Sequence, residues 1–236
     1  MNGRAKGKDR KAVGALACGL RALVLTLGGI ATAAAQITSP GVAPLPGGAN
    51  SCLTITLRIY NYARVPAWTL SRAERETAEI FRMTGVETAW IDCRVSTADP
   101  PTPACEQPVS SSDLFLKLLP ASKARAFPSY PDTFGITLAE KNWPGTDAII
   151  FYGRIATLAR ADHLFEQDIL AAVMAHEIGH LLLGVGHSPT GIMRAKWDQK
   201  ELILAERGLL MFTPEQSVPI RDEVAARRAH ADARRQ

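Results

Sequence analysis

The stretch from His176 to His187 constrains this chain more than any other. It reads H-E-x-x-H-x-x-x-G-x-x-H, with Glu177 directly after the first histidine and His180 four residues beyond it. Residues four apart share one face of a helix, so both imidazoles can reach a single metal ion. The glutamate is then placed to hold and deprotonate a metal-bound water. The pattern therefore predicts a metal site with hydrolytic chemistry.

The surroundings of the motif favour metal binding over a helix that carries histidines by chance. Apolar residues flank it, at 171–175 before the motif and at 181–183 within it. Burying two histidines and a glutamate in such a helix is costly unless these groups have partners. A metal ion is such a partner, and three of the chain's five histidines fall within this one stretch.

A catalytic zinc ion needs a third protein ligand, and His187 is the first candidate. On a straight helix, His187 would lie about 10 Å beyond His180 along the axis, which is too far for one ion to bridge. The helix must therefore end before His187, and the chain must turn back. Gly184 and Gly186 supply the conformational freedom that such a turn requires.

The motif and the turn-rich loop after it resemble the metzincin clan of zinc metallopeptidases, and its matrixin-like members most closely. The resemblance is close over residues 170–195, and the order of strands and helices resembles that fold over 53–195. It implies a Zn²⁺ site with zinc ligands His176, His180 and His187, general base Glu177, and Met193 as the methionine of the turn beneath the metal.

One departure from the family pattern concerns the third ligand. Three leucines, 181–183, separate His180 from the glycine where the family has two residues, so the glycine and His187 are each displaced by one. The alternative third ligand is a glutamate on a later helix, as in thermolysin-like enzymes, and Glu201 lies at a suitable distance along the chain. Both assignments stay open on the sequence.

Hydrophobic periodicity predicts an α+β fold of the α/β-sandwich type, in which a mixed sheet of four to five strands packs against an active-site helix and a backing helix. Strands are expected at 53–62, 86–92, 113–119 and 147–152, with a short edge strand at 134–139. Helices are expected at 69–84, from 162–168 to 183, at 199–206, and from a capping box at 213–216 into a charged tail at 227–236. Ser71 is the candidate cap of the first helix. The strand at 147–152 is almost continuously apolar, which predicts burial on both faces.

The first 35 residues are typical of a secretory signal peptide. Basic residues between Arg4 and Lys11 precede an apolar run at 22–30, and the alanines at 33–35 form a cleavage pattern. Arg21 interrupts the apolar stretch and leaves it too short to favour an uncleaved membrane anchor. We therefore expect a secreted or periplasmic protein that is not attached to a membrane after cleavage.

Cleavage would also remove the basic charge. Residues 1–35 carry six basic residues and one acidic residue, a net +5, whereas the whole chain carries +4, so the mature chain is close to −1. No pattern of basic and aromatic residues indicates nucleic-acid binding, and the expected partner is a protein or peptide substrate. The expected organisation after the signal peptide is a flexible leader at 36–50, a catalytic domain at 51–212, and a C-terminal helix and tail at 213–236.

Three cysteines remain after cleavage, and an exported protein can keep disulfides. Cys93 and Cys105 flank a proline-rich loop and are predicted to pair, which stabilises a fold by roughly 3 kcal/mol in the chain-entropy description. Cys52 is left as a buried thiol, as the partner of one of the other two, or as a thiolate that caps the metal.

The motif and the export signal together predict a secreted zinc-dependent metalloendopeptidase, in which Glu177 takes a proton from water and passes it to the leaving amine. Two other functions fit the same residues. One is a zinc-containing protein that binds peptides or a partner without turnover, and the other is a zinc amidase that acts on a non-protein or cell-wall amide. Glu177 disfavours a purely structural site, because such a site has no need of a carboxylate at that position.

Overall fold

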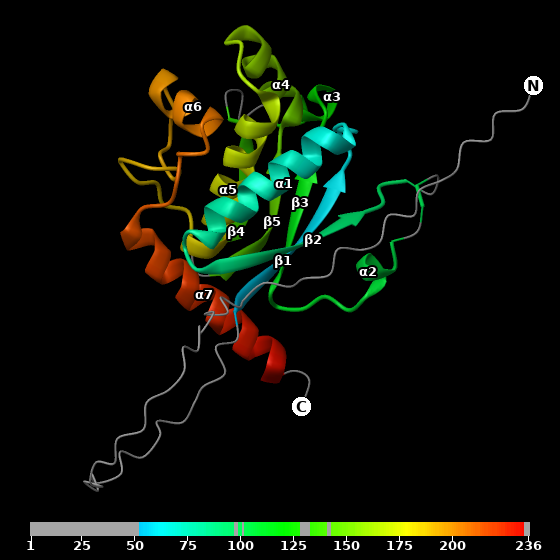
Figure 1. Ribbon diagram of the computed structural model, residues 1–236. Helices are drawn as coiled ribbons and strands as arrows, with labels where there is room; N and C mark the ends of the chain where they lie inside the picture. The colour runs from blue at the N-terminus through cyan, green and yellow to red at the C-terminus, as the bar shows by residue number, and fades with distance from the viewer. Residues whose placement is uncertain (1–51, 97–98, 101, 128–132, 141–142, 234–236) are drawn as a thin grey trace, which may run out of the picture. The chain divides into compact units, whose positions relative to one another are not determined.

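Five strands form one mixed sheet in the part of the chain that the computed structural model describes, residues 52–96, 99–100, 102–127, 133–140 and 143–233 (Figure 1). The strands are β1 (Leu53–Asn61), β2 (Val86–Cys93), β3 (Asp113–Leu118), β4 (Gly135–Glu140) and β5 (Trp143–Ile150). Their order is β2-β1-β3-β5-β4, with β4 antiparallel to β5 and the other pairs parallel. The predicted mixed sheet and its edge strand are confirmed, whereas the signal peptide and leader predicted at 1–35 and 36–50 lie outside the described residues.

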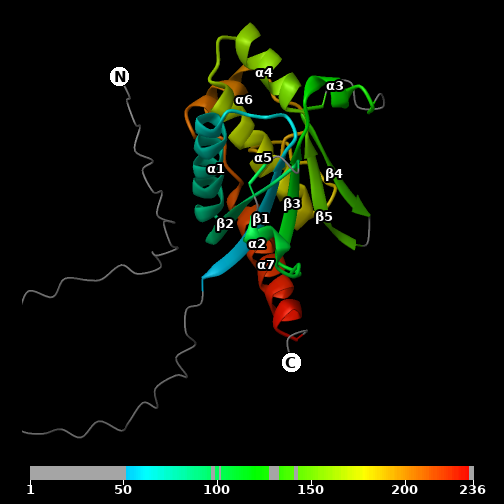
Figure 2. The same ribbon diagram turned by 90° about the vertical axis from the view of Figure 1, so that its right-hand side faces the viewer.

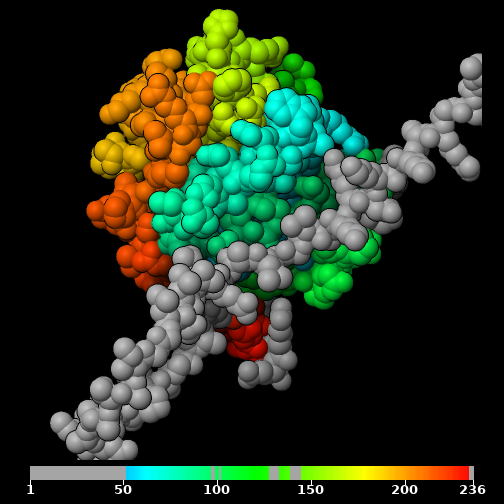
Figure 3. All heavy atoms as spheres, viewed as in Figure 1, coloured from blue at the N-terminus to red at the C-terminus, as the bar shows by residue number. Residues whose placement is uncertain are grey.

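The main helices pack on one face of this sheet. The helices are α1 (Ala67–Arg82), α2 (Pro103–Glu106), α3 (Ala121–Ala124), α4 (Tyr152–Ala161), α5 (Glu166–Leu183), α6 (Gln199–Glu206) and α7 (Pro214–Ala233). Figure 2 shows α1 and α5 beside each other on one side of the strands, and α5 contacts β3, β4 and β5 while α1 contacts β2. In space-filling form, α1 runs across this helical face next to α6 (Figure 3). The helix that carries the motif is therefore α5, and the predicted backing helix is α1.

Alternation along the strands creates the core. On β1, Ile55, Leu57 and Ile59 are at most 1% exposed and face the helices, because side chains two apart lie on the same face of a strand. The matching residues of β3 are Leu114, Leu116 and Leu118. Each fully buried side chain of this kind contributes about 1.5–3 kcal/mol relative to an exposed one.

The fifth strand is buried on both faces, as its apolar run predicted. Ala148 and Ile150 belong to the main core under the helices, whereas Ile149 and Phe151 pack with Ala124 in a smaller cluster on the other side of the sheet. A strand between two apolar layers has no polar face, which is why its sequence does not alternate.

The start of the first helix was predicted wrongly. α1 begins at Ala67, directly after Pro66, and no side chain caps its first turn. Ser71 lies inside the helix, where its hydroxyl donates to the carbonyl of Trp68. Proline fixes φ near the helical value, so the chain enters the helix earlier than a cap at Ser71 would allow.

The region after the fifth strand also differs from the prediction. β5 ends at Ile150, and α4 starts at Tyr152, where the sequence predicted that the strand would continue. Ile155 and Ala159 of α4 are buried and lie four residues apart, so this short helix presents one apolar face to the fold. The aromatic residues at 151–152 fit both kinds of element, and only the packing decides between them.

The last helix extends further than the sequence indicated. α7 continues to Ala233 and contacts α5, β1 and β2, and the residues predicted to begin a charged tail are helical. Arg227 is only 5% exposed and donates to the backbone oxygens of Leu181 and Gly145 and to Glu223. None of the described helices is both long and apolar enough to cross a membrane.

The predicted disulfide between Cys93 and Cys105 is present and closes the proline-rich loop onto the end of β2. Arg58 supports this loop from β1, because its guanidinium donates to the backbone oxygen of Cys105 and pairs with buried Asp113. Cys52 is not a free thiol and does not pair with either of these cysteines, which excludes the buried thiol, the shared disulfide and the metal-capping thiolate.

Candidate metal centre

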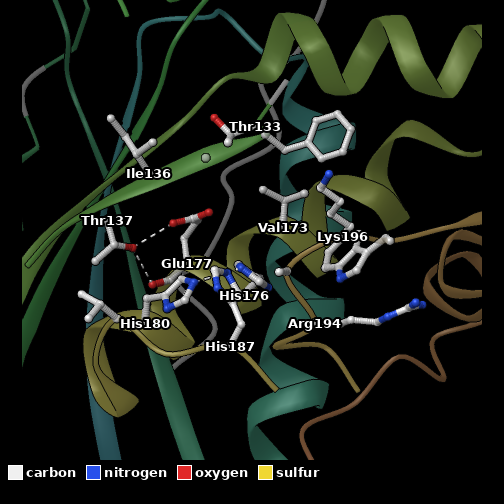
Figure 4. A pocket seen from close by; sticks show the side chains of 15 residues that line it. Thr133, Ile136, Thr137, Val173, His176, Glu177, His180, His187, Arg194 and Lys196 are labelled. Carbon is white, nitrogen blue, oxygen red and sulfur yellow. Dashed lines mark hydrogen bonds between the residues drawn. The ribbon is translucent and has the colours of Figure 1, made fainter. Parts of the chain in front are cut away.

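The α5 helix places three side chains of the motif on one side of a cavity. His176 and His180 are one turn apart and point the same way, and Glu177 faces β4 beside them (Figure 4). Nearly all of α5 is buried, because it lies between α1 and the sheet. The helix is therefore held on all sides, and its polar residues are presented from a rigid element.

The hydrogen bonds of the two helical histidines fix their tautomers. Nδ1 of His176 lies 2.7 Å from the backbone oxygen of Ile192, and Nδ1 of His180 lies 3.0 Å from that of Gly184. A carbonyl only accepts, so each Nδ1 carries the proton and each Nε2 presents a lone pair. The two Nε2 atoms lie 3.1 Å apart.

Two lone pairs at this separation repel each other unless a cation lies beside both. Tetrahedral zinc with nitrogen ligands at 2.0–2.1 Å places two such nitrogens about 3.3 Å apart. The 3.1 Å between the Nε2 atoms of His176 and His180 fits that geometry. The donor set therefore fits zinc on the chemistry and spacing of the described atoms alone.

The chain turns back after α5 and brings His187 to the other two histidines. The helix ends at Leu183, and Gly184 adopts a φ of 88°, a conformation that residues with a Cβ rarely adopt. The ring of His187 lies 4.7 Å from that of His180, centroid to centroid, and 5.5 Å from that of His176. One ligand atom from each of the three lies within 4.8 Å of the others. The turn thus brings His187 beside the other two histidines despite the extra residue between His180 and Gly184.

The other candidate for the third position lies elsewhere. The Glu201 carboxylate accepts a hydrogen bond from the backbone of Asp198 at the start of α6 and pairs with Arg194. It is 8% exposed and is held by these contacts, and it does not belong to the group of three histidines among the described residues. The capping of α6 accounts for Glu201 without a metal.

Burial keeps the helical histidines neutral. The pKa of His176 is lowered to about 4, chiefly by desolvation and also by the neighbouring His180 and His187, against the opposing effect of the hydrogen bond to Ile192. Desolvation likewise lowers the pKa of His180. The neutral imidazole is the form that binds a metal, so both side chains are in that form at neutral pH.

Glu177 is the buried carboxylate of the site, with 5% of its surface exposed. Desolvation raises the pKa of its carboxyl to about 7, although the hydrogen bond from the Thr137 hydroxyl lowers it. A base whose pKa lies near neutrality can both take up and release a proton in the same reaction cycle. The burial of Glu177 thus suits proton transfer.

Met193 lies under the motif in the turn that follows His187. It is 1% exposed, and its sulfur packs so closely on Gly179 that a Cβ on this glycine would lie 2.5 Å from it. Glycine at the fourth position of the motif therefore lets the turn approach the helix. The same turn carries the Ile192 oxygen that accepts a hydrogen bond from His176, so the position of the turn directly affects the orientation of the His176 ring.

The cavity in front of these residues has a volume of about 720 Å³ and lies between β4 and the loop before α6 (Figure 4). The sequence predicted the edge strand but did not indicate which residues in and next to that strand, and in the loop before α6, complete the site. They are Thr133, Phe134, Gly135, Ile136, Thr137, Arg194, Ala195, Lys196 and Trp197. Trp197 stacks edge-on against His176, at 5.7 Å between ring centroids, and donates to the same Ile192 oxygen.

The comparisons with known proteins add little to this geometry. No protein-family model matches the chain, and no curated protein matches it in sequence. Among solved structures, the archaemetzincin from Methanopyrus kandleri is 17% identical, with a TM-score of 0.47 over 76% of this chain and 99% of that chain. The solution structure of TM1509 from Thermotoga maritima is 11% identical, with a TM-score of 0.30 over 75% of this chain and 91% of that one. At these values neither likeness assigns a family or an activity to the chain.

Proposed function

We propose that the protein is a zinc-dependent hydrolase that cleaves peptide bonds. The observation that carries this proposal is the convergence of three imidazoles, one nitrogen of each lying within 4.8 Å of the others, beside the buried Glu177 carboxylate in one open cavity. Zinc would be held by His176, His180 and His187, and a metzincin-type active site is the arrangement that the motif and its methionine turn resemble.

The chemistry divides between the metal and the chain. Bound zinc lowers the pKa of water and polarises a carbonyl group. Glu177 takes up the proton of the attacking water and returns it to the leaving amine, for which a pKa near 7 is suited. His176 and His180 hold their Nδ1 protons on backbone oxygens throughout, which keeps both rings oriented.

A peptide is the substrate class that the cavity favours. β4 is the edge strand of the sheet, so one side of its backbone has no partner strand among the described residues, and it borders the cavity. An extended peptide can pair with such an edge and present a carbonyl to the histidines. The proposed endopeptidase therefore has a strand to align its substrate along the site.

We also propose that the protein is exported. The N-terminal sequence has the charge, apolar run and small residues of a signal peptide, and the Cys93–Cys105 disulfide is of the kind that persists in oxidising compartments. Expression with the native N-terminus, followed by fractionation and N-terminal sequencing, tests this directly. A cytosolic product that begins at Met1 would contradict it.

The decisive screen uses casein and a broad peptide library, together with a panel of cell-wall and small amides. We expect cleavage of internal peptide bonds, its loss on addition of a chelator, and its return with zinc. Stoichiometric zinc without cleavage of any peptide would replace the proposal with a binding function. Cleavage confined to non-protein amides would make the protein an amidase.

A further inference from the structure

The side chain of Glu177 rests against β4 through two residues on one face of that strand, Gly135 and Thr137. The Thr137 hydroxyl lies 2.8 Å from Oε2 of Glu177 and 3.1 Å from its backbone oxygen (Figure 4). A methyl group on Gly135 would lie 2.5 Å from Oε1. The strand thus contacts both carboxylate oxygens, and we call Gly135 and Thr137 the β4 seat.

The helix alone does not fix this carboxylate. A glutamate side chain has three torsions, and rotation about the last one is broad, so α5 sets the Cα of Glu177 but not the direction of its oxygens. A carboxylate that transfers protons needs one oxygen directed at the reacting water within hydrogen-bond reach. Occupation of Oε2 by the Thr137 hydroxyl leaves Oε1 for that task.

We infer that the β4 seat positions the Glu177 carboxylate for proton transfer. Thr137 is a positioning residue that holds Oε2, and Gly135 leaves the space in which Oε1 lies. The inference rests on the proposed function, because that function makes Glu177 the base. It gives the edge strand a second role, which is separate from any pairing with a substrate backbone.

A purely structural role for Thr137 is the competing explanation. A hydroxyl has one proton, and Thr137 can donate it to the backbone oxygen of Glu177 instead, which would merely fasten β4 to α5. Both roles predict that Thr137→Val lowers probe affinity and the rate of cleavage. They differ in whether this loss depends on the carboxylate of Glu177.

A double-mutant cycle separates the two roles without relying on turnover. The measurement is the affinity of the zinc-loaded protein for acetohydroxamic acid, a small chelator with two oxygens whose hydroxyl proton passes to an adjacent base on binding. The variants are Thr137→Val, Thr137→Ser and Glu177→Ala, with Thr137→Val also combined with Glu177→Ala. Leu138→Ala is the control, because this neighbour on β4 is 52% exposed and does not line the cavity.

We expect Thr137→Val to weaken the binding of acetohydroxamic acid about 10-fold, which is within the range found when a supporting hydrogen bond of a metal site is removed. Thr137→Ser keeps the hydroxyl and should bind like the wild type, as should Leu138→Ala. On the Glu177→Ala background, Thr137→Val should have no further effect. In peptide cleavage, Thr137→Val alone should lower kcat and leave KM and zinc content unchanged.

Two results would overturn the inference: wild-type affinity in Thr137→Val, or an equal loss with and without the Glu177 carboxylate. Should Thr137→Val fail to fold, Gly135→Ala tests the seat from its other side, and its binding must weaken only when Glu177 is present. A wild-type protein that binds zinc and acetohydroxamic acid but cleaves no peptide would refute the proposed function alone, since the double-mutant cycle would still measure the effect of the β4 seat on Glu177.

Discussion

Arg227 provides a demanding test of how the C-terminal helix supports the site. Its buried guanidinium donates to the oxygen of Leu181, in the last turn of α5, at 3.0 Å and to that of Gly145 at 3.1 Å. It also pairs with Glu223 one turn earlier in α7. Replacing it with methionine keeps an unbranched stem of similar helix propensity and removes all of these contacts.

The expected cost follows from the groups left behind. A hydrogen bond from a charged donor to a buried acceptor contributes about 1.5–3 kcal/mol, and two backbone oxygens lose theirs. The partly exposed pair with Glu223 adds about 0–1 kcal/mol. Since methionine also relieves the burial of a charge, we expect Arg227→Met to lower the free energy of unfolding by about 3 kcal/mol.

Urea denaturation followed by circular dichroism measures this difference. Arg228→Met is the matched control, because the neighbouring side chain is 43% exposed and its contacts are long, at 4.0 Å to Asp232 and 3.4 Å to the backbone oxygen of Cys52, so its loss should cost less than about 1 kcal/mol. Equal stabilities of the two variants would show that Arg227 is not held as described. The C-terminal part of α7 would then contribute little to the stability of the fold, as the predicted charged tail implied.

Two further predictions concern Glu74 and the third position of the metal centre. Desolvation and the neighbouring Asp92 raise the pKa of Glu74 to about 8, so the folded protein keeps a proton that the unfolded chain releases above its ordinary value of 4.5. The free energy of unfolding should therefore fall between pH 5 and 8. Glu74→Gln should abolish this fall and be the more stable protein at pH 8. Parallel pH profiles of the two proteins in urea denaturation would contradict this. At the metal centre, His187→Ala should weaken zinc binding by more than the roughly 10- to 100-fold that the loss of an outer-shell partner costs, whereas Glu201→Gln should leave it unchanged in competition with a chromophoric chelator. The reverse order would make Glu201 the third ligand.

The sheet and the motif helix were predictable because their signals are local. Alternation along 53–61 and a continuous apolar run in β5 follow directly from one or two buried faces. The turn at Gly184 was predictable from distance alone, since a straight helix cannot bring His187 to a shared ion. These features depend on the chain over a few residues, and the structure confirms them.

The helix in the C-terminal segment was harder to read because one of its buried positions is charged. Ile220, Val224, Arg227 and Ala231 follow helical spacing and are all buried, but the arginine breaks the apolar pattern. Its burial depends on two distant backbone oxygens, which no local pattern indicates. The start of α4 was missed for a different reason, because its first residues continue the apolar run of β5.

The β4 seat was not predictable because it depends on a contact between elements forty residues apart. The edge strand was expected, but the residues facing α5 are set by the register of β4 on β5, in which Thr137 lies opposite Ala148. Shifting that register by one residue would turn Thr137 away from Glu177. The close packing at Gly179 was easier to predict, since a glycine inside a helix usually has a packing reason.

The central claim is that three histidines and Glu177 form one hydrolytic zinc site, and Glu177→Ala tests it most directly. Zinc content by mass spectrometry and the rate of peptide cleavage are measured together on wild type and variant. We predict one zinc per chain in both proteins and a loss of rate of at least about 100-fold in the variant, the range expected for a general base. Cleavage by the variant at the wild-type rate, with the same zinc content, would contradict the account.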